Sequence, residues 1–239
     1  SAGRVEEAHA FVCRLEVESG VAKAAEMIVP PVQKKEKIRL AQLWWPPFAR
    51  RTLMLWLIWF GIVFSYYGIF TWLPKLLAEQ GYSVVKTFEY VLVMILAQLP
   101  GYFAAAVLVE KIGRKATLAG FLGACAVCAY CFGQSGSTLE IMLWGSLMSF
   151  FNLGAWGVLY TYTPELYPVR FRAFGSGWAG AVGRIGGIVA PMVVAGMSGS
   201  GGFARIFVMF AAVLAAVVLV IVLLGEETKG RTLEEISAD

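Results

Sequence analysis

Six long apolar segments dominate this sequence and limit what it can fold into. They run over residues 52–74, 88–109, 116–134, 141–163, 174–197 and 205–224. A helix that crosses a bilayer needs about 20 apolar residues, and only short connections separate these segments. The composition agrees, since 59% of the residues are hydrophobic and only 15% are charged, which is more apolar than a typical soluble domain. We therefore predict an all-α membrane protein with six transmembrane helices.

The rest of the chain is predicted to lie outside the bilayer. Residues 1–45 are interpreted as a cytoplasmic linker with an amphipathic helix, because the apolar residues between 8 and 15 follow helical spacing. Residues 46–225 are the predicted transmembrane bundle, and residues 226–239 are a cytoplasmic tail. The chain begins at Ser1 without a methionine, so we expect a piece of a longer protein.

Basic residues gather in alternate connections, which predicts the orientation. Lysine and arginine in short loops favour the cytoplasmic side of a membrane. The segment before the first span and the second and fourth connections are rich in them, whereas the other connections are poor. Both termini are therefore predicted to be cytoplasmic. The net charge of +4 reflects these loops, so the lipid bilayer is the expected partner and nucleic acid is not.

A few polar side chains lie near the middle of apolar segments, where they are costly and usually face a cavity or a neighbouring helix. They are Tyr66, Tyr67, Gln98, Asn152, Trp156 and Arg184. Their similar depth in four spans predicts that they line one cavity that binds a small-molecule substrate. The alternative is that Gln98 and Asn152 only join helices by hydrogen bonds.

Arg184 is the most informative of these residues, because arginine keeps its charge in proteins. No acidic residue lies at a matching depth in the six segments. A guanidinium group offers a planar fork that fits a carboxylate, so we predict that it binds an organic anion. A structural ion pair with an absent part of the protein is the alternative. Nearby, Gly175, Ala179, Gly183 and Gly187 recur every four residues, which predicts close approach of a neighbouring helix.

Other patterns do not indicate chemistry. Cys125, Cys128 and Cys131 have a spacing seen in metal sites, but no histidine or acidic residue lies nearby. We interpret them as apolar packing residues and expect no metal. The sequence shows no convincing pair of nucleophile and base, so we expect no enzyme activity.

Two loops and the tail carry charged motifs of a known family. "EKIGRK" at 110–115 resembles the D-R-x-G-R-R/K loop of the major facilitator superfamily. "PELYPVRFRAFG" at 164–175 resembles its P-E-x-x-P-x-x-x-R-x-x-G loop, and "EETKGRTLEE" at 226–235 resembles the P-E-T-K-G tail of its sugar-porter branch. The resemblance implies the C-terminal half of a twelve-helix secondary transporter, with the missing N-terminal six-helix half as a partner.

The resemblance also implies a cytoplasmic gating network in these loops. Its residues would be Glu110, Lys111, Gly113, Arg114, Lys115, Glu165, Arg170 and Arg172. Glu110 replaces the usual aspartate and Lys111 the usual arginine, which keeps the sign of each charge. Glu226 stands where the family tail has proline, so we expect looser packing of the tail.

Longer stretches resemble the bacterial niacin transporters and also synaptic vesicle 2-type proteins. They are residues 59–74, 88–115, 149–168 and 183–191. This resemblance implies uptake of a small aromatic carboxylate, nicotinate, across the bacterial inner membrane, with no resident cofactor and with proton coupling left open. The alternatives are a sugar, another aromatic acid or an organic cation as substrate, or a membrane receptor or scaffold that does not transport.

Overall fold

The structure is a computed structural model that describes residues 14, 38–46, 48–79, 81–197 and 202–230. The chain divides into two units, Ser1–Lys37 and Ile38–Asp239. In the first unit only Arg14 is described, so the amphipathic helix predicted there lies outside the described residues. All elements below belong to the second unit.

Every regular element in the described part of this unit is a helix. The elements are the 3-10 helix η1 (Leu40–Trp44) and the α-helices α2 (Phe48–Glu79), α3 (Val84–Leu96), α4 (Gln98–Ile112), α5 (Arg114–Gly133), α6 (Thr138–Glu165), α7 (Val169–Met197) and α8 (Gly202–Leu224). Six stretches are long and apolar enough to cross a membrane, with α3 and α4 together forming one. The six predicted spans are therefore confirmed. Each begins a few residues before its predicted start, because the helices continue beyond their apolar cores.

Pro100 explains why the second span consists of two helices. α3 ends at Leu96 and α4 begins at Gln98, with Ala97 between them. Proline has no N–H to donate to the carbonyl four residues earlier, and its ring crowds that carbonyl. Here that carbonyl belongs to Leu96, where α3 ends. The proline thus divides the second span beside Gln98.

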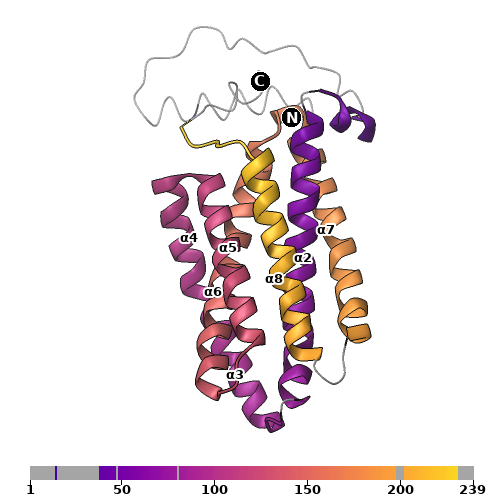
Figure 1. Ribbon diagram of the computed structural model, residues 1–239. Coiled ribbons are helices and arrows are strands. Elements are labelled where there is room, and N and C mark those ends of the chain that lie inside the picture. The colour runs from indigo at the N-terminus through magenta and orange to yellow at the C-terminus, as the bar shows by residue number, and fades with distance from the viewer. Residues whose placement is uncertain (1–13, 15–37, 47, 80, 198–201, 231–239) are drawn as a thin grey trace. The chain divides into compact units, whose positions relative to one another are not determined.

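α2 lies at the centre of the most closely packed helices. It packs along α7 on one side and along α8 on the other, and α8 in turn packs on α5 (Figure 1). α5 packs on α6, and α6 packs on α4. Although α6 and α7 are consecutive in the chain, they touch only slightly. The start of α2, the α4–α5 turn and the end of α8 lie at the same end of the bundle, at the top of Figure 1. We call this the charged end.

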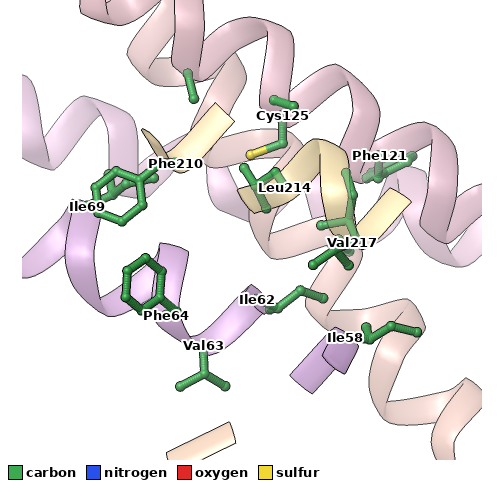
Figure 2. Packing of buried hydrophobic residues seen from close by; sticks show 14 of the residues in the cluster. Ile58, Ile62, Val63, Phe64, Ile69, Phe121, Cys125, Phe210, Leu214 and Val217 are labelled. Atoms are coloured by element: carbon green, nitrogen blue, oxygen red, sulfur yellow. The ribbon is translucent and has the colours of Figure 1, made fainter. Parts of the chain in front are cut away.

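Apolar side chains from α2, α5 and α8 form the packed core shown in Figure 2. Ile62 of α2 and Leu214 of α8 are fully buried there. The rings of Phe64 on α2 and Phe210 on α8 lie 5.7 Å apart between their centroids. Cys125 of α5 is also fully buried in this core. This packing holds α2 in place, and α2 in turn supports the site described below.

Glycines allow α7 to lie very close to α2. A Cβ atom on Gly183 would lie 2.9 Å from a methyl group of Val63, and one on Gly187 would lie 3.2 Å from the same side chain. The predicted close approach of a neighbouring helix is confirmed, and that helix is α2. The tightest contact is at Gly186, where a Cβ would lie 2.6 Å from the carbonyl oxygen of Phe60.

Candidate functional site

A cavity of about 790 Å³ lies between α6 and α7, with α2 at its back. It exists because α6 and α7 both pack on other helices and touch each other only slightly. The lining residues are Trp59 and Val63 from α2, Trp156, Tyr160, Thr163 and Pro164 from α6, and Val169, Arg172, Ala173, Ser176, Gly177, Gly180, Ala181 and Arg184 from α7. Tyr160 at its edge is 55% exposed, so the cavity is open on this side of the six-helix bundle.

Three aromatic rings form one wall of the cavity. Trp59 lies edge-on to Trp156 and to Tyr160, with centroid separations of 5.8 and 5.3 Å. The rings of Trp156 and Tyr160 are 5.7 Å apart and tilted by 33°. Trp59 is fixed further because its indole Nε1 donates to the hydroxyl of Thr163 at 3.0 Å. Such a wall can pack against a flat aromatic ligand.

Arg184 brings a permanent positive charge to the same cavity. Its side chain is exposed, and its Nη1 donates a long hydrogen bond of 3.4 Å to the hydroxyl of Tyr67. Tyr66 packs its ring against Trp156 with 5.7 Å between centroids. Four of the six predicted site residues therefore gather in one region. Trp156 and Arg184 line the cavity, and the two tyrosines contact those residues.

Small residues on α7 keep the cavity open. A Cβ atom added to Gly177 or to Gly180 would meet no other atom within 4 Å. Both glycines lie within two turns of Arg184 on α7, and both line the cavity with it. They contrast with Gly183 and Gly186, which face α2 and have no spare room. One face of α7 therefore packs tightly while the next leaves space for a ligand.

Gln98 and Asn152 lie apart from this cavity and are not among its lining residues. Asn152 is 1% exposed, and its Nδ2 donates to the sulfur of Cys125 on α5 at 3.6 Å. Gln98 is 6% exposed at the start of α4. The contact of Asn152 fits the alternative in which a polar residue joins neighbouring helices, and the structure brings neither residue to the cavity.

Arg172 and Ser176 line the cavity although mid-span polarity did not predict them there. Arg172 was expected only in the gating network. Its Nε and Nη2 atoms and the Oγ atom of Ser176 are buried and have no hydrogen-bond partner among the described residues. A signal was available in the sequence, since both residues belong to the row of positions four apart that leads from Arg184 toward the start of α7, although this row turns by about 40° around the helix at each step.

At the charged end, Arg114 and Glu165 form the central ion pair. The Nε of Arg114, at the start of α5, donates to both carboxylate oxygens of Glu165, at 3.2 and 3.1 Å. The hydroxyl of Thr228 donates to the same carboxylate. Glu110 lies 3.7 Å from Arg114 but is 76% exposed, so water screens that pair. The ion pair links the ends of α5 and α6 with the chain that follows α8.

Glu227 caps the first turn of α5. Its carboxylate accepts hydrogen bonds from the backbone N–H groups of Arg114 at 2.8 Å and Lys115 at 3.1 Å. A negative charge is favourable at a helix N-terminus because unpaired N–H groups point toward it. Gly113 is required beside this cap, since its φ is +96° and a Cβ there would lie 2.5 Å from the Glu227 carboxylate. Neither the cap nor Glu227 was predicted.

Glu226 binds the tail to two other helices. Its carboxylate lies 2.8 Å from the Nη2 of Arg51 on α2, whose side chain is 3% exposed. Its backbone N–H donates to the hydroxyl of Tyr162 on α6 at 3.1 Å, and that hydroxyl donates back to the Glu226 carbonyl. The expectation that a glutamate at this position loosens the tail is wrong, because the carboxylate gains an ion pair that proline would lack.

The remaining predicted gating residues are placed as follows. The Nζ of Lys115 donates to the carbonyl oxygens of Val222 at 3.1 Å and Gly225 at 2.9 Å, and so binds the end of α8. Such a cation is favourable because the last carbonyls of a helix carry partial negative charge. Lys111 accepts a hydrogen bond at its carbonyl oxygen from the side chain of Lys229. Arg170 lies over the ring of Phe171 at 5.5 Å.

Tyr167 anchors the connection between α6 and α7. The hydroxyl of Thr52 donates its proton to the carbonyl of Leu43 at 2.9 Å. It also lies 2.9 Å from the hydroxyl of Tyr167, and because the Thr52 proton is already used, the Tyr167 hydroxyl is the donor in this second bond. Burial raises the pKa of the Tyr167 phenol, an effect that the hydrogen bond with Thr52 opposes. The phenol is thus protonated at neutral pH and can fill this donor role.

A comparison with known proteins agrees with this architecture. Residues 1–239 match the family model described as Sugar (and other) transporter. The chain belongs to this family of the major facilitator superfamily. The family resemblance predicted from the loop motifs is therefore confirmed, and six membrane-spanning helices suit one half of such a transporter.

Three relatives are similar to most of this chain. The chain is 64% identical to the "Niacin transporter NiaP" of Acinetobacter baylyi over 235 residues, which cover 98% of this chain and 54% of that protein. It is 49% identical over 193 residues to the "Putative niacin/nicotinamide transporter NiaP" of Bacillus subtilis. This match covers 80% of this chain and 48% of that protein. It is 32% identical over 230 residues to the "Organic cation/carnitine transporter 7" of Arabidopsis thaliana, covering 91% and 46%. The chain thus spans about half the length of these relatives.

Proposed function

We propose that this chain is the second half of a twelve-helix transporter that carries nicotinate across the bacterial inner membrane by alternating access. The observation that carries this proposal is the position of Arg184, a permanent positive charge, in the same cavity as the aromatic wall of Trp59, Trp156 and Tyr160. The name of the Acinetobacter baylyi relative, at 64% identity, supports nicotinate as the cargo.

The cavity has the size and chemistry that nicotinate requires. Its volume of about 790 Å³ lies within the range of roughly 300–1,000 Å³ common for small-molecule sites. The pyridine ring packs against the aromatic wall, while the carboxylate accepts hydrogen bonds from the guanidinium of Arg184. Tyr66 and Tyr67 support these groups from α2. A first six-helix half would close the open side of the cavity and complete the binding site.

The charged end is proposed to act as the cytoplasmic gate, with both ends of this half on the cytoplasmic side. Arg114, Glu165 and Glu227 tie α5, α6 and the tail into one body, so this half can move as a unit during transport. The predicted gating residues Lys111, Lys115 and Gly113 act within it by holding the tail and the turn. We propose neither a resident cofactor nor an enzymatic step.

The test is uptake of radiolabelled nicotinate by cells that lack their own carrier and express the twelve-helix protein. Arg184→Gln should reduce uptake by about 10- to 100-fold, because a hydrogen bond to a charged group contributes about 1.5–3 kcal/mol. Arg184→Lys is the matched variant, since it keeps the charge and removes the planar fork. It should retain part of the uptake.

Competition experiments separate nicotinate from the other cargo classes. Excess unlabelled nicotinamide, which lacks the carboxylate, should not compete, and neither should carnitine or another organic cation, which Arg184 repels. Competition by a cation would favour the cargo named for the Arabidopsis relative. Normal uptake by Arg184→Gln, or no nicotinate uptake by the wild type, would overturn the proposal.

A further inference from the structure

The cavity continues along α7 from the middle of the span to the charged end. Arg184, Gly180, Ser176 and Arg172 recur every four residues, and all of them line the cavity. Four residues make slightly more than one helical turn, so these side chains form an inclined row that turns by about 40° around α7 at each step. With a rise of about 1.5 Å per residue, the twelve positions between the two arginines span about 18 Å. The cavity therefore extends from one guanidinium to the other.

Arg172 presents buried hydrogen-bond donors at the charged end of this cavity. Its Nε and Nη2 atoms have no hydrogen-bond partner within the part of the chain that the structure describes. These two nitrogens form one edge of the guanidinium, and their parallel N–H groups match the two oxygens of a carboxylate. Arg114 at the same end differs, because its Nε already donates to the carboxylate of Glu165.

Ser176 adds another donor one turn from Arg172. Its buried Oγ has no hydrogen-bond partner in the described segments either. The lining residues from 59 to 184 include neither aspartate nor glutamate. Buried donors cost free energy when they lack an acceptor. A hydroxyl group and a guanidinium edge on one face of a cavity without acidic residues therefore favour an anionic ligand.

We propose that Arg172 and Ser176 form a second carboxylate subsite, which the cargo occupies between Arg184 and the charged end. This inference rests on the proposed function, which supplies a small aromatic carboxylate as cargo. A single pyridine carboxylate is much shorter than the distance of about 18 Å along α7, so it binds the two subsites in turn. Arg172 thus acts on the cargo itself, which is a different role from the gating expected for it.

The test measures equilibrium binding of radiolabelled nicotinate to the purified twelve-helix protein in detergent. Arg184→Gln should keep a binding component at least about tenfold weaker than the wild type, and benzoate but not nicotinamide should compete for it. In this background, Arg172→Gln should abolish the residual component and Ser176→Ala should weaken it severalfold. Arg50→Gln is the control, because it removes a charge from the charged end, at the start of α2, and Arg50 does not line the cavity.

Ser176→Ala separates the subsite from an ion pair between Arg172 and the first half of the protein. It leaves every charge in place, so an effect on binding requires the hydroxyl to contact the ligand. Residual binding that responds to Arg172→Gln but not to Ser176→Ala would assign Arg172 to such an ion pair and overturn the inference. Loss of all binding in Arg184→Gln alone, or residual binding that neither second substitution changes, would also overturn it.

Two further controls complete the experiment. If Arg172→Gln prevents folding, as judged by gel filtration, Arg172→Lys replaces it, because lysine keeps the charge and loses the parallel N–H edge. That variant should weaken the residual component without changing the elution profile, and undiminished binding would count against the subsite. Failure of the wild type to bind nicotinate at all would instead reject the proposed function, and the subsite with it.

Discussion

Two glycines on α7 should respond in opposite ways to the same substitution. A methyl group on Gly186 would lie 2.6 Å from the carbonyl oxygen of Phe60 and 3.2 Å from the backbone nitrogen of Phe64. Both contacts are with backbone atoms of α2, so the helices must separate to relieve them. Overpacking of this kind costs about 1–3 kcal/mol. A methyl group on Gly180 meets no atom within 4 Å, so that substitution carries no such cost.

The intrinsic helix preference of alanine adds the same favourable term at both positions. Alanine is better than glycine in a helix by about 0.8–1.0 kcal/mol. Gly180→Ala should therefore be neutral or stabilising by up to about 1 kcal/mol, whereas Gly186→Ala should be destabilising by up to about 2 kcal/mol once this term is subtracted. The difference between the two variants should be about 1–3 kcal/mol, because the propensity term cancels.

The assay is denaturant unfolding of the purified twelve-helix protein in detergent micelles, with the wild type and both variants side by side. Tertiary unfolding is followed by tryptophan fluorescence, since Trp59 packs against α7 near Gly183. A midpoint for Gly186→Ala equal to or above that of Gly180→Ala would refute the reasoning, because it would mean that α7 does not press against α2 as closely as the structure has it.

Two other substitutions test the cavity and the charged end. Gly180→Phe should place a ring in the cavity and reduce nicotinate uptake at least about tenfold. The unfolding midpoint should stay near that of Gly180→Ala, since no side chain must move to admit the Cβ atom. Normal uptake would show that the cargo does not pass this position. Gly113→Ala should destabilise by at least about 1–2 kcal/mol, because its φ of +96° disfavours any Cβ and the Glu227 carboxylate occupies the space. Hydrogen exchange of the Arg114 and Lys115 amides should become faster in this variant, and unchanged protection of both would contradict the proposed cap.

The sequence predicted the spans because their signals are local. An apolar run of about 20 residues must be helical in a bilayer, where backbone groups find no other partners. The break in the second span followed equally locally from Pro100, which acts on the carbonyl of Leu96 four residues earlier. The glycine stripe predicted that another helix lies close, but it could not tell that this helix is α2.

The candidate site was only partly predictable. Asn152 and Trp156 lie one turn apart on α6, about 40° apart around its axis, and spacing alone placed them together. In the fold, Asn152 contacts Cys125 on α5, while Trp156 faces the cavity. Such a small rotation separates the two environments, so depth in the membrane says little about which one a polar residue meets.

The sequence by itself determined that this chain forms six apolar helices and that Arg184 carries a permanent charge near the middle of the fifth, because hydropathy and the charge of a side chain are properties of one segment. Only the tertiary structure decided that Arg172 joins Arg184 in one cavity and that Glu226 and Glu227 bind the tail to α2 and α5. These contacts depend on the rotation and neighbours of every helix at once, which packing of the whole bundle fixes.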